Sequence, residues 1–215
     1  MPTTHPPSRS ETYRAASRWA DATQHPFIQA LAADALPPDT FAAYMAQDYV
    51  FVGALADAVG HLIAKAPTLA AKRRLTNFLA AVLDDEDAFF ASVLAQAGSR
   101  DQAIRPIARA FSDLLRASAA ADSYGPGLAA LHAGEWVYLT WGERVAASPP
   151  HTPAYRRWTA LHAEPAFAEF VHWLQSEVDT LVLSAHDEAR ARANFIQAVD
   201  YEVAFFSAFW PGDSQ

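Results

Sequence analysis

The sequence predicts an all-α protein built as a multi-helix bundle, and three observations indicate this class. Alanine is abundant and clusters of β-branched residues are scarce, as in helical proteins. Prolines fall between segments of apolar periodicity, which is the pattern of helices separated by short turns. No segment shows the convincing alternation of a strand, and hydrophobic residues make up 52% of the chain, enough for a substantial core.

The clearest helical pattern begins at Asp39, an N-cap residue that follows two prolines, and ends before Pro67. Its apolar residues recur with the 3,4 spacing of a buried stripe, at Phe41, Met45, Val52, Leu55, Val59 and Leu62. Similar patterns predict helices at 10–22, 26–36, 39–66, 68–97, 105–121, 127–147, 153–162, 165–182 and 184–209. Breaks at Gly98, at a turn from Tyr124 to Gly127 and at Pro149-Pro150 are too short to be interdomain linkers.

We expect residues 1–9 to form a disordered N-terminal segment and residues 10–215 to form one helical domain. The formal charge of −8 disfavours nucleic acid and anionic membranes as partners. The chain has no cysteine, which excludes disulfides, thiolate metal sites and a cysteine nucleophile. Because the first ten residues lack an apolar region and no apolar run approaches the ~20 residues of a membrane span, we expect a cytoplasmic protein.

Three acidic residues occupy positions at which an apolar stripe predicts a core-facing side chain. Asp48 continues the stripe of the helix 39–66, and Glu135 and Glu202 interrupt the stripes of the helices 127–147 and 184–209. An ionised carboxylate in an apolar interior costs several kcal/mol unless it is paired. Burial also raises the pKa of a carboxyl group, which is how a general acid is made near neutral pH. The alternative is that each acid is a structural group, satisfied by a Tyr or Trp donor or by an arginine.

Aromatic residues are dense around these acids, and aromatic walls with a few carboxylates suit a flat cationic heterocycle. The alternative is that the rings only fill the core. The eight histidines form no HExxH or ExxH helix motif, and the acidic run 84–87 lacks the histidine that a diiron bundle uses, so we expect no metal. There is no glycine-rich phosphate loop.

Segments between His25 and Trp210 resemble the TenA, or thiaminase II, family, whose members adopt the haem-oxygenase-like helical bundle. The segments are His25-Pro26-Phe27, 41–49, Trp136-Val137-Tyr138 with Trp141-Gly142-Glu143, 155–158 and 200–206. The first and the last are the most specific. The resemblance implies a thiaminase II-like hydrolase of thiamin salvage that needs no cofactor. Its substrate would be an aminopyrimidine: an aminomethyl- or formylaminomethyl-pyrimidine, or thiamin.

The resemblance also assigns site residues, position by position. Four residues of this chain, Asp48, Tyr138, Glu202 and Phe205, match residues with which the family binds or converts the pyrimidine. This chain has Gly134 in place of the family's nucleophilic cysteine, and Phe51, Phe111 and His162 in place of tyrosines. It is thus similar to the cysteine-lacking branch of the family, which relies on glutamate, and Glu135 is the natural substitute.

We therefore expect three catalytic residues: Asp48 holds the 4-amino edge of the pyrimidine, Glu202 protonates a ring nitrogen, and Glu135 positions or deprotonates a water. The substrate-binding residues would be Asp48, Phe51, Phe111, Tyr138, His162 and Phe205.

Two other functions stay open, because a fold alone does not decide function. One is a non-catalytic or repurposed small-molecule binding protein of the same fold, and the other is a metal-dependent oxygenase of the haem-oxygenase-like superfamily. In the leading hypothesis the partner is a small pyrimidine, without nucleic acid or membrane. Amphipathic helices with exposed aromatic residues such as Trp173 suggest self-association, and the resemblance implies a homotetramer or homodimer.

Overall fold

The computed structural model describes residues 6–97, 103–120 and 123–210, apart from the side chains of 85–87 and 96–97. Within these ranges every regular element is helical, so the predicted all-α class is confirmed. The helices are α1 (Arg9–Ala15), α2 (Trp19–Thr23), α3 (Pro26–Ala32), α4 (Pro38–Lys65), α5 (Leu69–Ala81), the π-helical η1 (Val82–Glu86), α6 (Asp87–Ala97), α7 (Pro106–Ala120), α8 (Tyr124–Ala146), α9 (Pro153–Leu161), α10 (Pro165–Thr180) and α11 (Ala185–Phe209).

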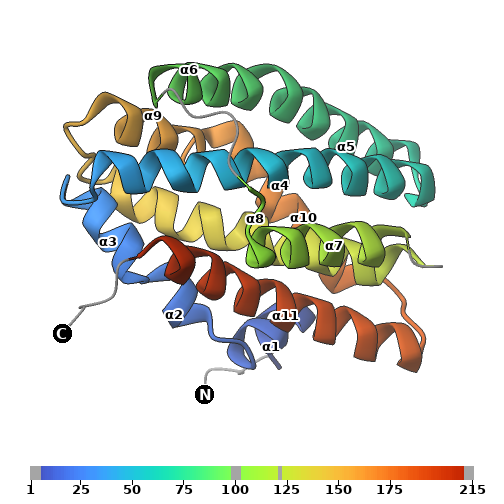
Figure 1. Cartoon of the computed structure of the whole chain (residues 1–215). Helices are drawn as coiled ribbons and strands as arrows, with labels where there is room; N and C mark the ends of the chain where they lie inside the picture. Colours follow the sequence, from blue (N-terminus) through green and yellow to red (C-terminus); the bar gives the residue numbers. More distant parts are fainter. Residues whose placement is uncertain (1–5, 98–102, 121–122, 211–215) are drawn as a thin grey trace.

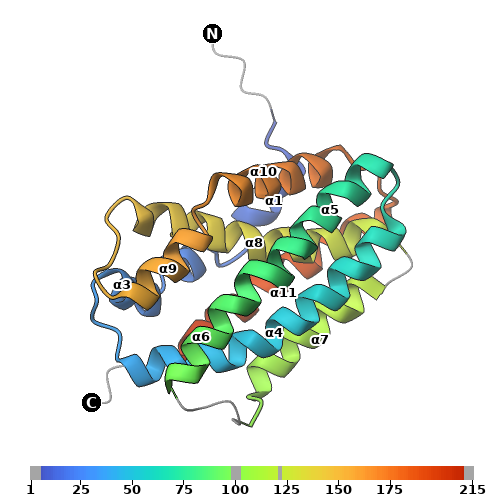
Figure 2. The ribbon, with the colours of Figure 1, turned by 90° about the horizontal axis from the view of Figure 1, so that it is seen from above.

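Four helices, α4, α7, α8 and α11, form the centre of the bundle. The most extensive packing joins α11 to α8 and α4 to α7, and α7 also contacts α8 and α11. In Figure 1, α5 and α6 run back over α4 on one side, while α1 and α2 lie beside α11 on the other. Figure 2 shows the same bundle from above, with α9 and α10 beside α8. Polar groups that point between the four central helices are therefore enclosed.

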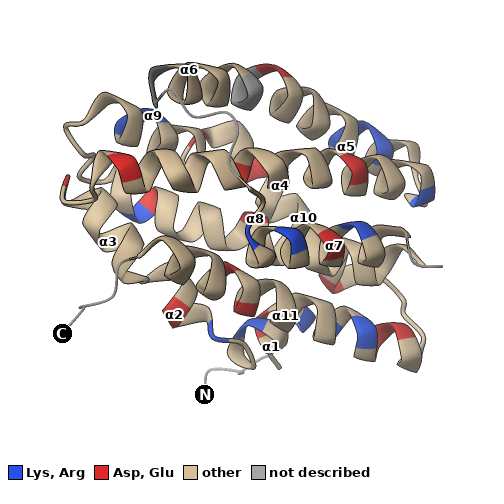
Figure 3. Ribbon diagram, viewed as in Figure 1, with Lys and Arg blue, Asp and Glu red and all other residues tan. Residues whose placement is uncertain are grey.

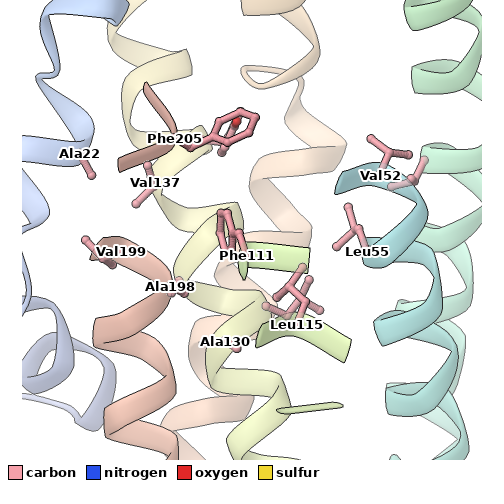
Figure 4. Close-up of a cluster of buried hydrophobic side chains, with 14 of the residues drawn as sticks. Ala22, Val52, Leu55, Phe111, Leu115, Ala130, Val137, Ala198, Val199 and Phe205 are labelled. Carbon is pink, nitrogen blue, oxygen red and sulfur yellow. The ribbon is translucent and has the colours of Figure 1, made fainter. Parts of the chain in front are cut away.

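The core between these helices is apolar. Figure 4 shows side chains from α4, α7, α8 and α11 gathered in one interior region, among them Val52, Phe111, Val137 and Val199. The stripe predicted for α4 is confirmed, because its six apolar residues from Phe41 to Leu62 are all buried. Charged residues of both signs are interspersed along α7 and α11 in Figure 3, whereas those of α5 are all Lys or Arg. In the described part of the chain, no helix is long and apolar enough to span a membrane.

The N-terminal helices differ from the prediction in two ways. Residues 1–5 of the expected disordered segment lie outside the described residues, but Ser8 caps α1, which begins at Arg9. The single helix expected at 10–22 is divided into α1 and α2, because each is anchored differently. Tyr13 of α1 donates a 2.6 Å hydrogen bond to Glu188, whereas Trp19 of α2 packs against Trp136. The chain bends between them to reach both partners.

Two further expectations about helix boundaries are corrected. The helix expected at 68–97 contains the π-helical η1, which nothing in its apolar spacing indicates. The turn expected from Tyr124 to Gly127 is instead the first turn of α8, where the missing N–H of a proline is harmless. Its glycines serve close packing: a Cβ at Gly125 would lie 2.6 Å from Leu183, and one at Gly127 would lie 2.7 Å from the backbone of Ala119.

Candidate active site

A small cavity lies between α4, α8, α9 and α11, at the level of the acidic residues. Its volume is about 30 Å³, whereas one water needs roughly 10–15 Å³. In this conformation the cavity therefore holds on the order of two waters, and a pyrimidine requires side chains to move on binding. The wall is formed by Asp48, Phe51, Val52, Leu55, Gly134, Glu135, Tyr138, Trp158, His162 and Glu202.

On the α4 side, a chain of hydrogen bonds leads to Asp48. Tyr44 lies four residues earlier, one turn away on the same face, and its hydroxyl is hydrogen-bonded to the Asp48 carboxylate. An ionised carboxylate only accepts, so Tyr44 donates this bond, and Tyr138 in turn donates to Tyr44 across 2.6 Å. Burial and then the charge of Asp48 raise the pKa of both phenols well above their usual value. The relay holds the carboxylate on the cavity wall.

Glu202 is the most enclosed acid of the site. Its side chain belongs to α11 and is 1% exposed, and neither of its carboxyl oxygens has a hydrogen-bond partner among the described residues. Burial raises the pKa of this carboxyl group well above its usual value, and the charges of Asp48 and Glu135 raise it further. These conditions favour the protonated form near neutral pH, as in a general acid.

Helix α8 contributes Gly134 and Glu135 to the wall of the same cavity. Glu135 is half-buried and close enough for its charge to act on Glu202. A Cβ at Gly134 would lie 3.5 Å from Oε1 of Glu202, which is ordinary van der Waals contact. The glycine therefore leaves open space directly in front of the acid.

The residue after α9, His162, completes the wall. Its ring is buried and contacts Tyr138, with 4.7 Å between ring centroids, and Trp158, with 4.3 Å between centroids. Its Nδ1 lies 3.0 Å from the carbonyl oxygen of Trp158, and burial lowers its pKa to about 4. The close approach depends on Gly142, because a Cβ there would lie 2.5 Å from the carbonyl oxygen of His162.

Two aromatic residues expected to bind substrate, Phe111 and Phe205, are not among the residues that line the cavity. Phe111 of α7 packs against Phe51 at a centroid distance of 4.5 Å, and Phe205 packs edge-on against Tyr44 at 5.4 Å. Two further residues, Tyr44 and Trp158, belong to the site although the spacing of apolar residues does not assign them to it. The position of Tyr44 one turn before Asp48 was the signal that could have found it.

The model of the TENA/THI-4/PQQC family matches residues 13–211. The chain belongs to the TENA/THI-4/PQQC family. The "aminopyrimidine aminohydrolase" of Bacillus subtilis (strain 168) is 27% identical over 199 residues, covering 89% of this chain and 84% of that protein. The protein of the same name from Helicobacter pylori is 22% identical, with 89% of this chain and 93% of that protein covered.

Solved structures of similar fold include TenA homologues from two Pyrococcus species. The "TenA homologue protein from P.horikoshii OT3" has a TM-score of 0.85 and 22% identity, covering 96% of this chain and all of that chain. The Pyrococcus furiosus homologue has a TM-score of 0.86 and 20% identity, covering 94% of this chain and 100% of that chain. The fold of this family member is thus the haem-oxygenase-like bundle.

A larger hollow of this TENA/THI-4/PQQC family member, about 300 Å³, lies between α5, α9 and α10. Its charged side chains, Arg74, Glu164 and Glu169, are all exposed, and none of the expected site residues lies on its wall. Enclosed polar groups occur instead at the smaller cavity. Within the described residues, no cluster of three His, Asp or Glu side chains is arranged to hold a metal ion.

Proposed function

We propose that this chain is a thiaminase II-like hydrolase that acts on an aminopyrimidine, with an aminomethyl- or formylaminomethyl-pyrimidine as the favoured substrate class. The observation that carries the proposal is Glu202, an enclosed and unpartnered acid beside two further acids in one cavity. An acid kept protonated by burial can donate to a ring nitrogen. The printed names of the relatives, aminopyrimidine aminohydrolase, support the same substrate class.

In the proposed reaction each acid has a separate part. The carboxylate of Asp48, held by Tyr44, accepts a hydrogen bond from the 4-amino group of the pyrimidine. Glu202 donates its proton to a ring nitrogen, which makes the exocyclic methylene more electrophilic. A water occupies the space in front of Gly134, its oxygen bonds to the methylene carbon, and its proton passes to Glu135. With the aminomethyl-pyrimidine, the bond from the methylene carbon to the ammonium nitrogen breaks and ammonia leaves, so atoms and charge balance.

Phe51 and Trp158 are the cavity-wall rings best placed to hold the pyrimidine flat, by stacking. Phe111 packs against Phe51 and Phe205 packs against Tyr44, so both act as binding residues of an outer layer. Tyr138 and His162 contribute polar groups, a phenol and an imidazole, to the wall of the binding cavity. No metal or cofactor takes part in this proposal.

Ammonia release from 4-amino-5-aminomethyl-2-methylpyrimidine tests the proposal. We expect turnover by the unaltered chain and a loss of at least 100-fold in Glu202→Gln, which keeps the shape of the side chain but cannot donate an acidic proton. Undiminished turnover in a folded Glu202→Gln variant would overturn the role of this acid. Binding of the pyrimidine without ammonia release would instead favour a repurposed small-molecule binding protein.

We further propose that the enzyme works in the cytoplasm in thiamin salvage, as a homotetramer or homodimer. The self-association argument from Trp173 is weaker than the sequence suggests, because this ring is half-buried and packs against Phe170. Light scattering on the purified protein tests the oligomeric state, and a monomer at micromolar concentration would contradict it. Growth of a deletion strain on the aminomethyl-pyrimidine as thiamin precursor tests the pathway.

A further inference from the structure

The position of His162 in the cavity wall is fixed by the end of α9 and by close backbone packing against α8. The histidine follows α9 directly, and its backbone approaches α8 so closely that only a glycine fits at 142. The residue is 6% exposed and lines the cavity, and its ring lies against Tyr138 and Trp141. The ring orientation is therefore fixed before any ligand binds.

The hydrogen bond to Trp158 also fixes the tautomer of this ring. A carbonyl oxygen can only accept, so Nδ1 of His162 carries a hydrogen and donates it to the carbonyl oxygen of Trp158, across 3.0 Å. In a neutral imidazole the other nitrogen, Nε2, then has a lone pair and no hydrogen. Burial lowers the pKa of His162 to about 4, which keeps the ring neutral at physiological pH.

The second ring nitrogen of His162, Nε2, is free to accept a hydrogen bond. Nε2 has no hydrogen-bond partner among the described residues, and it is not one of the fully enclosed polar atoms, unlike both ring nitrogens of His132. The hydrogen bond that His162 makes at the end of α9 uses Nδ1 only, so it leaves Nε2 without a structural role. Here the second nitrogen offers a neutral acceptor in a pocket whose other polar side-chain groups are acids, a phenol that already donates to Tyr44, and the indole N–H of Trp158, which can only donate.

We propose that His162 is a specificity-determining residue, whose Nε2 accepts a hydrogen bond from an N–H or O–H group on the exocyclic methylene of the ligand. This inference rests on the proposed function, because it takes the ligand to be a pyrimidine with such a substituent. It goes further in stating which ligand feature the pocket selects. A pocket built to accept a hydrogen bond rejects the analogue that lacks the donor.

Two neutral ligands isolate this contact: 4-amino-5-hydroxymethyl-2-methylpyrimidine carries the donor, and 4-amino-2,5-dimethylpyrimidine lacks it. Both keep the ring and the 4-amino group, and neither carries an ionised substituent that the nearby carboxylates would attract. Two variants of His162 separate the nitrogens. Asparagine places an amide N–H near the position of Nδ1 but offers nothing at Nε2, whereas glutamine places an acceptor oxygen near Nε2.

Calorimetric titration of the full chain with both ligands measures the ratio of their dissociation constants. We expect about tenfold tighter binding of the hydroxymethyl ligand to the unaltered chain, which corresponds to one hydrogen bond. In His162→Asn the ratio of the two dissociation constants should fall to within about twofold, because the hydroxymethyl ligand loses this contact, and in His162→Gln most of the ratio should remain.

An unchanged ratio in His162→Asn, or equal weakening of both ligands, would overturn the inference and leave His162 a structural residue. Absence of binding by either pyrimidine to the unaltered chain would overturn the proposed function, and the inference with it. Equal binding of the two ligands to the unaltered chain would refute the role of His162 alone. Thermal unfolding of each variant checks that the fold is intact.

Discussion

The enclosure of Glu202 predicts that this acid lowers the stability of the protein as the pH rises. The pKa of Glu202 is raised in the folded state by burial and by the charges of Asp48 and Glu135, so the folded state holds its proton more tightly than the unfolded state does. The stability associated with this proton is fully present below the ordinary carboxyl pKa. It is lost as the pH rises through the raised pKa. Glu202→Gln has no proton to lose and should escape this loss.

The magnitude follows from proton linkage. Between the unfolded and the folded pKa, each pH unit removes about 1.4 kcal/mol of stability from the unaltered chain relative to Glu202→Gln. For a protein of this size that slope corresponds to roughly 3–5 °C of Tm per pH unit. Above the folded pKa the difference becomes constant. The pH at which it levels off therefore measures the pKa of Glu202 in the folded protein.

Urea unfolding of both proteins at half-unit steps from pH 4 to pH 9 measures this difference. The two stability curves should run together near pH 4 and separate above it, with the glutamine variant the more stable. Glu143→Gln, at an exposed position on the same helix as Glu135, is the control and should run parallel to the unaltered chain. Parallel curves for Glu202→Gln would refute the argument that this acid is buried and proton-bound.

Three other perturbations have definite expected outcomes. Gly142→Ala places a Cβ 2.5 Å from the carbonyl oxygen of His162 and should cost about 1–3 kcal/mol in urea unfolding, whereas Gly60→Ala, with open space around its Cβ, should be neutral or stabilising. Tyr138→Phe removes the hydroxyl that donates to the neighbouring phenol and should lower Tm by a few degrees, for about 1 kcal/mol. His132 has a pKa lowered by burial to about 3, so its contribution to stability is present above pH 6.5 and is lost as the pH falls. His132→Leu has no such group to protonate, so its free energy of unfolding should fall less on acidification than that of the unaltered chain. The difference, measured by unfolding titrations at low pH, should reach up to about 5 kcal/mol.

Helical periodicity predicted the parts of the site that depend on one helix. Asp48 and Glu202 are buried because they lie on stripes whose other members form the core, and the spacing alone shows this. The same spacing predicts α4 with almost its observed ends, because Pro38 marks where the helix begins and Pro67 stops it from continuing.

Features that depend on two helices could not be obtained in this way. Tyr44 and Tyr138 are 94 residues apart, and no local pattern relates their hydroxyls. The place of His162 depends on the missing side chain at Gly142, a contact between backbones that periodicity does not describe. Glycine and proline at 125–127 predict a turn, whereas in the structure they allow close packing and the start of α8.

The central claim is that the cavity beside Asp48 and Glu202 binds an aminopyrimidine, and thermal unfolding with a ligand tests it most directly. A ligand present at one hundred times its dissociation constant stabilises the folded state by about 2.7 kcal/mol, which is roughly 5–10 °C of Tm here. We predict this shift for the unaltered chain with 4-amino-5-hydroxymethyl-2-methylpyrimidine, and little or none for Asp48→Ala at the same concentration. No shift at any soluble concentration, or an equal shift in both proteins, would contradict the assignment of this cavity.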